Sequence, residues 1–139
     1  DRCATLDTTP YEASDIDEWW AKHDHRYRVV VAEDGHGEIV GWASLNEFSH
    51  RCAHKDIADL SVYVARSHRG RGIGKALLGD LERRARQSFH KIVLHALNDN
   101  APGKRLYENM GYREVGIFRE HGKLDGQLVD VIAMEKILS

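Results

Sequence analysis

The glycine-rich segment from Arg69 to Lys75 constrains the fold more than any other part of this sequence. It lies between residues 57–65, whose alternating pattern predicts a strand, and residues 73–87, whose apolar stripe predicts a helix. Amides at a helix start have no helical partner, and the helix dipole favours an anion there. Glycines let a phosphate approach these amides, and basic residues add positive charge. The segment therefore predicts a phosphate-binding site, with a plain connecting turn as the alternative.

Two common nucleotide-binding motifs do not fit this segment. The Walker pattern Gly-x-x-x-x-Gly-Lys-Ser/Thr is absent, and the glycine spacing of two and two differs from the Rossmann pattern Gly-x-Gly-x-x-Gly. The phosphate-binding prediction therefore points to another kind of cofactor site.

The rest of the chain alternates strand and helix signals. A capping-box pattern at Ser14 and Asp17 predicts a helix over residues 13–24. The other predicted elements are strands at 27–33, 38–47, 57–65, 91–97, 112–120 and 128–137, helices at 73–87 and 101–110, a hairpin turn at 34–37, a polar loop at 48–55, and turns at Gly122 and Asp125-Gly126. Asn100 is placed to cap the second of these helices. The central strand–helix–strand block predicts a parallel crossover within an otherwise antiparallel sheet, which is an α/β fold.

Composition limits the classes of protein and partner. With 139 residues, 42% hydrophobic and 30% charged, the chain predicts a single globular domain over residues 1–139. A formal net charge of −2 gives no reason to expect nucleic-acid or membrane partners. Cys3 and Cys52 form no disulfide framework, which favours a reducing, cytoplasmic location. The nine histidines show no zinc-type spacing, so no metal is expected.

Two motifs in order resemble those of the GNAT superfamily of N-acetyltransferases. Arg69, Gly72 and Gly74 match the family's Gln/Arg-x-x-Gly-x-Gly/Ala pattern after a Val-Tyr-Val strand end. Asn100 and the block Leu106-Tyr107-Glu108-Asn109-Met110-Gly111-Tyr112 resemble the family's Asn…Leu-Tyr-Glu-Lys-Leu-Gly-Phe. Residues 4–10, 40–43, 59–64 and 113–116 with 130–131 are most similar to the phosphinothricin and methionine sulfone/sulfoximine branch. By this resemblance the family's first strand and helix precede residue 1 and are absent from the sequence.

The resemblance implies acetyl-CoA as co-substrate and places it on named residues. Pantetheine is expected to pair with the backbone of Val62, Tyr63 and Val64, where an N–H near Val62 polarises the thioester carbonyl. Asn100 matches the family's cofactor-contacting Asn. The diphosphate is expected on the glycine-rich segment, which comprises Arg69, Gly70, Arg71, Gly72, Ile73, Gly74 and Lys75.

The same resemblance implies two catalytic residues. Asp59 is the candidate general base, because it occupies the position of the branch's catalytic Glu. It is one methylene shorter than Glu, so a bridging water is expected between it and the amine. Its alternative role is a solvated or salt-bridged carboxylate. Tyr107 matches the family Tyr that protonates the departing thiolate, and its alternative role is packing of helix against sheet. A His that some members carry late in the chain is replaced here by Val129.

The acceptor site is expected in the loop that follows the second hairpin strand. Arg51 matches an Arg suited to hold a substrate carboxylate, Phe48 is a candidate pocket wall, and an exposed loop charge is the alternative for Arg51. The predicted function is acetylation of the primary amine of a small amino-acid-like substrate by a homodimer, as is common in the branch. A non-catalytic acetyl-CoA-binding module and acetylation of protein N-termini, polyamines or aminoglycosides remain open.

Overall fold

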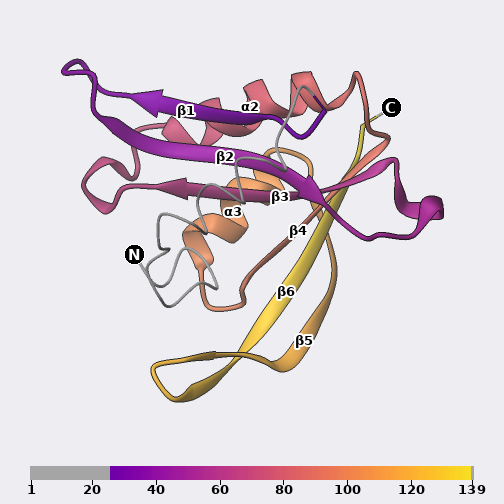
Figure 1. Ribbon diagram of the computed structural model, residues 1–139. Coiled ribbons are helices and arrows are strands. Elements are labelled where there is room, and N and C mark those ends of the chain that lie inside the picture. The colour runs from indigo at the N-terminus through magenta and orange to yellow at the C-terminus, as the bar shows by residue number, and fades with distance from the viewer. Residues whose placement is uncertain (1–25, 139) are drawn as a thin grey trace, which may run out of the picture.

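The computed structural model describes residues 26–138, and the helix expected at residues 13–24 lies outside this range. Within it the chain forms one six-stranded sheet with helices packed against it (Figure 1). The elements are β1 (Val29–Glu33), β2 (Ile39–Glu47), η1 (Cys52–His54), β3 (Ile57–Val64), η2 (Arg66–His68), α2 (Ile73–Ala85), β4 (Lys91–Leu97), α3 (Ala101–Asn109), β5 (Arg113–Leu124) and β6 (Gln127–Ile137). None of the helices in this range is long and apolar enough to cross a bilayer.

The sheet has the mixed topology that the sequence predicts. Its strand order is β1-β2-β3-β4-β6-β5, and every pairing is antiparallel except that of β3 with β4. Helix α2 connects these two parallel strands, as the crossover prediction requires. The predicted α/β fold is therefore confirmed, and the crossover brings the start of α2 to the end of β3.

Helix α2 packs closely on the first half of the sheet. Its buried residues follow helical spacing, and they are Leu77, Leu78, Leu81, Glu82 and Ala85. Gly41 in β2 permits this approach, because a Cβ there would lie 3.2 Å from Leu77 Cδ1 and 3.0 Å from the Tyr63 carbonyl oxygen. The helix ends at Ala85, two residues before the predicted end at residue 87. The close contact between the backbone of β2 at Gly41 and Leu77 thus positions the N-terminal half of α2.

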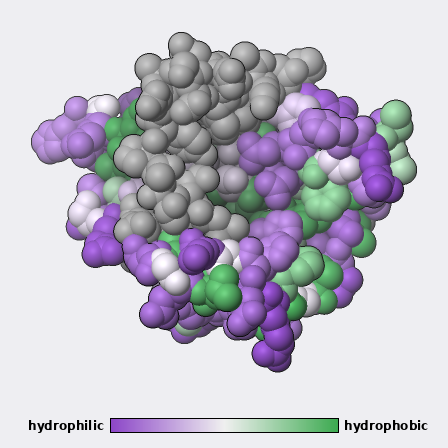
Figure 2. All heavy atoms as spheres, turned by 60° about the horizontal axis from the view of Figure 1, so that its bottom comes forward, coloured by the Kyte–Doolittle hydropathy of each residue, from purple (hydrophilic) through white to green (hydrophobic). Residues whose placement is uncertain are grey.

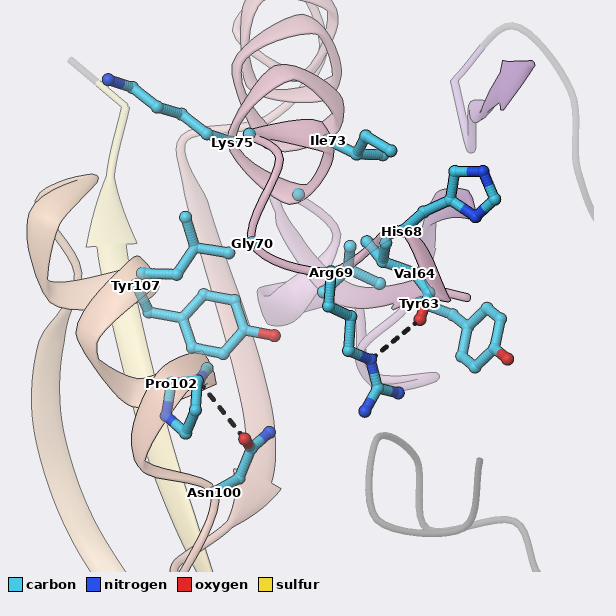
Figure 3. Close-up of a pocket in the computed structure, with 15 residues that line it drawn as sticks. Tyr63, Val64, His68, Arg69, Gly70, Ile73, Lys75, Asn100, Pro102 and Tyr107 are labelled. Carbon is cyan, nitrogen blue, oxygen red and sulfur yellow. Dashed lines mark hydrogen bonds between the residues drawn. The ribbon is translucent and has the colours of Figure 1, made fainter. Parts of the chain in front are cut away.

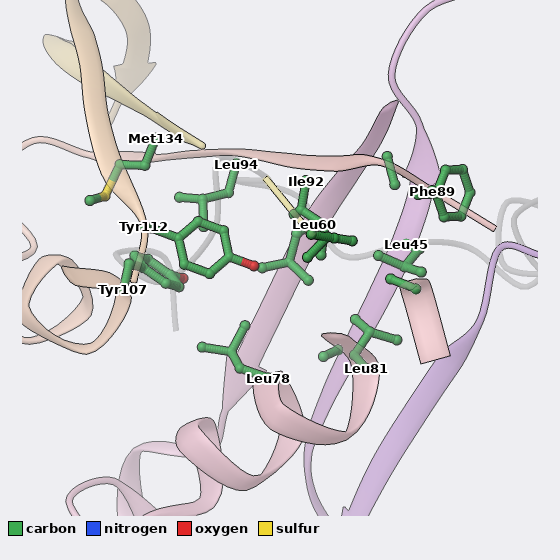
Figure 4. Close-up of a cluster of buried hydrophobic side chains, with 14 of the residues drawn as sticks. Leu45, Leu60, Leu78, Leu81, Phe89, Ile92, Leu94, Tyr107, Tyr112 and Met134 are labelled. Carbon is green, nitrogen blue, oxygen red and sulfur yellow. The ribbon is translucent and has the colours of Figure 1, made fainter. Parts of the chain in front are cut away.

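One buried cluster joins both helices to the sheet (Figure 4). Leu78 and Leu81 of α2 meet Leu60 of β3 and Leu94 of β4 in this cluster, and each of these four residues is at most 5% exposed. Tyr107 of α3 joins the same cluster. Burial of such apolar side chains contributes about 1.5–3 kcal/mol each, so the cluster fixes where both helices sit.

The face of the molecule shown in Figure 2 is largely hydrophilic where it is coloured, and apolar side chains line a hollow near its middle.

The hairpin at the end of the chain differs from its prediction in one respect. Gly122 was expected in a turn, but it lies inside β5 and pairs with Val129. The register shifts between Phe118 and Gly122, so a bulge interrupts the ladder and pairing then resumes. A glycine in a strand often marks such a bulge. The turn itself is at Asp125 and Gly126, with φ of 51° and 80°, as predicted.

Candidate functional site

A cleft of about 340 Å³ opens where β3, α2 and α3 meet (Figure 3). Its lining comes from the end of β3, the segment leading into α2, and one side of α3. The lining residues are Val62, Tyr63, Val64, His68, Arg69, Gly70, Gly72, Ile73, Gly74, Lys75, Asn100, Pro102, Gly103, Leu106 and Tyr107. The structure therefore brings together most residues that the sequence assigns to cofactor binding and catalysis.

The glycine-rich segment presents backbone amides at the start of α2. Gly70 and Gly72 adopt left-handed backbone with φ of 78° and 81°, a region that costs other residues about 1–2 kcal/mol. Gly72 is the N-cap of α2, no side chain caps this end, and no acidic residue lies in its first turn. The first amides of a 13-residue helix thus face the cleft without a capping oxygen. With the positive end of the helix dipole, this geometry suits an anion.

The edge of β3 that faces β4 is open along the cleft. The parallel pairing runs only from Ile57–Lys91 to Leu60–Leu94, after which β3 continues to Val64 and β4 to Leu97. The two strands separate beyond that point, as Figure 1 shows. Among the described residues, no strand pairs with β3 on this side past Leu60. The backbone groups there can pair with an extended ligand as a strand would.

The glycine-rich segment and the residue before it carry basic side chains. The Arg69 Nε–H donates to the carbonyl oxygen of Val64 at 3.1 Å, which ties this segment to the end of β3 (Figure 3). Lys75 lines the cleft and is exposed, whereas Arg71 is exposed and lies outside the lining. His68 lines the cleft, which the sequence analysis did not anticipate. Of the residues predicted to bind the cofactor, Arg71 alone is thus outside the lining of the cleft.

Helix α3 forms the opposite wall through residues at helical spacing. Asn100 caps it, as predicted, with Oδ1 accepting from the Gly103 amide at 3.3 Å. Gly103 has no room for a side chain, because a Cβ would lie 2.6 Å from Asn100 Nδ2. A Cβ at Gly74 would lie 3.0 Å from Leu106 Cδ2, so that glycine lets α3 approach the start of α2. The width of the cleft therefore depends on small residues.

Tyr107 stands at the base of the α3 wall and directs its hydroxyl into the cleft (Figure 3). The residue is only 8% exposed, and its ring centroid lies 6.0 Å from that of Tyr112. Burial raises the pKa of Tyr107 to about 12. The phenol therefore keeps its proton throughout the physiological range and can donate it.

The remaining predicted residues lie away from the cleft lining. Asp59 alternates with the buried Ala58 and Leu60, so it lies on the sheet face away from the core. Its carboxylate Oδ1 is 3.7 Å from Nδ1 of His95. Phe48 and Arg51 are exposed in the loop between β2 and β3, next to the start of β3. The structure brings Asp59 to the point where β3 and β4 separate.

Sequence analysis missed five residues of this region. Pro102, Gly103 and Leu106 line the cleft, and their spacing from Asn100 and Tyr107 on one helix is the signal that identifies them. His68 directly precedes Arg69, but nothing in its local sequence marks it. His95 reaches Asp59 only through the pairing of β3 with β4.

Among residues 26–138, no group of three or more His, Cys, Asp or Glu residues could hold a metal ion.

Comparison with known proteins gives a consistent result. Residues 2–112 match the model of the acetyltransferase (GNAT) family. The chain is 33% identical to the phosphinothricin N-acetyltransferase of Streptomyces coelicolor, over 96% of this chain and 81% of that one. It is 30% identical to the L-methionine sulfoximine/L-methionine sulfone acetyltransferase of Pseudomonas paraeruginosa, over 95% and 78%.

A solved structure extends this comparison to the fold. It is a GNAT superfamily phosphinothricin acetyltransferase from Sinorhizobium meliloti in complex with AcCoA. It shares 28% identity with this chain, over 99% of this chain and 75% of that one, with a TM-score of 0.90.

Proposed function

The chain belongs to the acetyltransferase (GNAT) family, and on that premise we propose that it acetylates the primary amine of a small amino-acid-like substrate with acetyl-CoA. The observation that carries the proposal is the cleft in which the uncapped start of α2, the open edge of β3 and the Tyr107 hydroxyl meet. The similarity to phosphinothricin and methionine sulfone acetyltransferases supports the choice of substrate class.

The residues present fit acetyl-CoA. We assign the diphosphate to the amides from Gly70 to Lys75, since a Cβ at Gly70 or Gly72 would meet no atom within 4 Å and a phosphate can therefore approach. Arg69 and Lys75 add positive charge in the lining, and we assign Arg71 a longer-range contribution to the same field. Val62, Tyr63 and Val64 offer the strand edge along which pantetheine pairs, and Asn100 lies at the far wall.

Each end of the reaction has a residue suited to it. Acetyl-CoA supplies an acetyl group activated as a thioester. We assign the polarisation of the thioester carbonyl to the backbone N–H near Val62. Tyr107 donates its proton to the departing sulfur, because burial keeps the phenol protonated. We assign Asp59 the role of general base toward the acceptor ammonium. Because its side chain is short, we expect a bridging group, at its simplest a water molecule, to carry the proton between the amine and the carboxylate.

We assign the acceptor's carboxylate to Arg51. The loop that carries Arg51 follows β2, whose Asn46 pairs in register with Asp59, so the loop lies near the acceptor face. A guanidinium binds a carboxylate bidentately, which orients an α-amino acid through its acid group. Phe48 is 37% exposed and packs edge-on against His54, with ring centroids 5.5 Å apart, which makes it a suitable apolar wall.

The proposal is tested by thiol release from acetyl-CoA with a panel of amines. The panel includes phosphinothricin, methionine sulfone, a polyamine and a peptide with a free N-terminus. We expect turnover with the amino-acid analogues and its loss in Asp59→Asn with intact cofactor binding. Cofactor binding without turnover on any amine would instead identify a non-catalytic acetyl-CoA-binding module, and a preference for the polyamine or peptide would replace the substrate class.

We further propose that the protein is a homodimer. Val115, Ile117 and Phe118 of the edge strand β5 are 53%, 46% and 46% exposed, and Leu128 of β6 is 57% exposed. An edge strand with exposed apolar side chains suits a second copy of the same strand. Light scattering coupled to gel filtration is expected to give twice the chain mass, and Ile117→Lys is expected to halve it.

We propose the cytoplasm as the place of the reaction. The exposed free thiol of Cys52 suits a reducing compartment. Fractionation of cells that produce the tagged chain, with a periplasmic or secreted marker as control, tests this assignment.

A further inference from the structure

Asp59 and His95 form a carboxylate–imidazole pair across the only parallel pairing in the described sheet, which spans residues 29–137. Asp59 of β3 is in register with Val93 of β4, and His95 follows two residues later, so both side chains project from the same sheet face. The distance from Asp59 Oδ1 to His95 Nδ1 is 3.7 Å. The side chains are 30% and 34% exposed, which leaves the pair accessible to a solute.

The pair lies where the two strands separate. Leu60 and Leu94 are the last residues of the parallel pairing, and Asp59 comes just before this point while His95 comes just after it. The open edge of β3 that lines the cleft begins at the next residues. The cleft reaches the gap between β3 and β4 from the α2 and α3 side of the sheet. An acceptor bound at this pair reaches the same gap from the opposite side.

Residues of β5 and β2 lie beside the two members of the pair. The ring of Phe118 in β5 lies 6.1 Å from the His95 ring, tilted by 39°. Asn46 of β2 donates through Nδ2 to the backbone oxygen of Asp59 at 3.4 Å and to Ser61 Oγ at 3.2 Å. Because Nδ1 of the imidazole is turned to the carboxylate, Nε2 faces away from it. The arrangement is that of a base oriented by an acid.

We propose that His95 is the base that takes the proton from the acceptor ammonium, and that Asp59 positions His95 and stabilises the imidazolium that forms. This inference rests on the proposed acetyl transfer, and it identifies His95 as the bridging group that carries the proton between the amine and the Asp59 carboxylate. Imidazole is the side chain whose ordinary titration lies nearest to neutral pH, which suits a general base. The separation of 3.7 Å exceeds a hydrogen bond, and catalytic contacts of this kind commonly shorten when substrate binds.

The proton and electron count is as follows. The ammonium gives one proton to His95 Nε2, and the freed lone pair forms the N–C bond to the acetyl carbonyl carbon. The C–S bond breaks, its electron pair leaves on sulfur, and the sulfur takes the proton of the Tyr107 hydroxyl. The second proton of the nitrogen restores Tyr107, so His95 carries the single proton that the reaction releases to solvent.

The test is His95→Ala with imidazole added back. The wild type, His95→Ala and the control His36→Ala, an exposed residue in the β1–β2 turn, are assayed with methionine sulfone and acetyl-CoA. Blanks contain imidazole without the amine. Coenzyme A affinity and melting temperature are measured on the same samples, because they report on binding and folding without turnover.

We expect His95→Ala to lower kcat by about 100-fold or more, with KM and coenzyme A affinity within about threefold of wild type. Imidazole is expected to restore at least about tenfold of that loss and to leave His36→Ala unchanged. A kcat within about threefold of wild type, or a loss that imidazole does not restore, would overturn the role of His95 while acetyl transfer stands. An inactive wild type that still binds coenzyme A would overturn both.

Discussion

Gly72→Ala tests the phosphate site at the start of α2 most directly. Gly72 has φ of 81°, and a Cβ built on it would meet no atom of the protein within 4 Å. The substitution therefore causes no clash within the chain, and its effects are limited to backbone strain and to the space that a ligand would occupy.

The size of both effects follows from these facts. Left-handed backbone costs an alanine about 1–2 kcal/mol. The alanine also lowers the conformational entropy of the unfolded chain, which offsets part of this cost, so the free energy of unfolding should fall by about 1 kcal/mol. For a chain of this length that lowers the melting temperature by about 4 °C. Loss of one amide–phosphate hydrogen bond costs about 1.5–3 kcal/mol, which weakens coenzyme A affinity about 10- to 150-fold.

Gly37→Ala provides a matched control. Gly37 has φ of 78°, a Cβ there would also meet no atom within 4 Å, and it lies in the turn between β1 and β2, away from the cleft. Calorimetric titration with coenzyme A and thermal melting are measured for both variants. We expect similar losses of stability and a loss of affinity in Gly72→Ala alone. Wild-type affinity in Gly72→Ala, or an equal loss in both variants, would refute the assignment of the amides to phosphate.

Three other changes test separate parts of the site and the fold. Tyr107→Phe should lower kcat about 10- to 100-fold while coenzyme A affinity stays within about twofold, as measured by steady-state kinetics and titration; equal kcat would show that the phenol donates no proton. Arg51→Ala should raise KM about tenfold for an α-amino acid but leave it unchanged for the corresponding amine without a carboxylate. Hydrogen bonding to Lys91, aided by Arg113, holds the pKa of Glu135 below its ordinary value of 4.5. The unfolded chain therefore binds a proton at this carboxyl more tightly than the folded chain does, so the free energy of unfolding falls as the pH drops below that value. Thermal melts between about pH 6 and pH 3 should therefore be flatter for Glu135→Gln than for wild type.

Features set by local sequence were predictable. The boundaries of β4, the cap of α3 at Asn100 and the turn at Asp125-Gly126 each depend on a few neighbouring residues, and the structure confirms all three. The turn expected at Gly122 was wrong, because a bulge in β5 absorbs this glycine and the partner strand decides where pairing resumes. Local signals alone cannot anticipate that choice.

Contacts between residues far apart in the chain could not be predicted from the sequence. His95 and Asp59 are 36 positions apart, and their contact requires both the parallel register of β3 with β4 and the point where that pairing ends. Side-chain chemistry was therefore predictable where partners are adjacent in sequence, and not where the sheet brings them together.

The separation of β3 from β4 divides the proposed reaction between two kinds of structure. On the α2 and α3 side, the proposed cofactor contacts are mainly backbone amides and glycines, whose position is fixed by the buried leucines of α2. On the other face, the proposed acceptor contacts are side chains of β3, β4 and the β2–β3 loop, which are partly exposed and contribute little to the core. Substitutions on the acceptor face should therefore change which amine reacts with little effect on stability or coenzyme A affinity, because burial on the opposite face sets both.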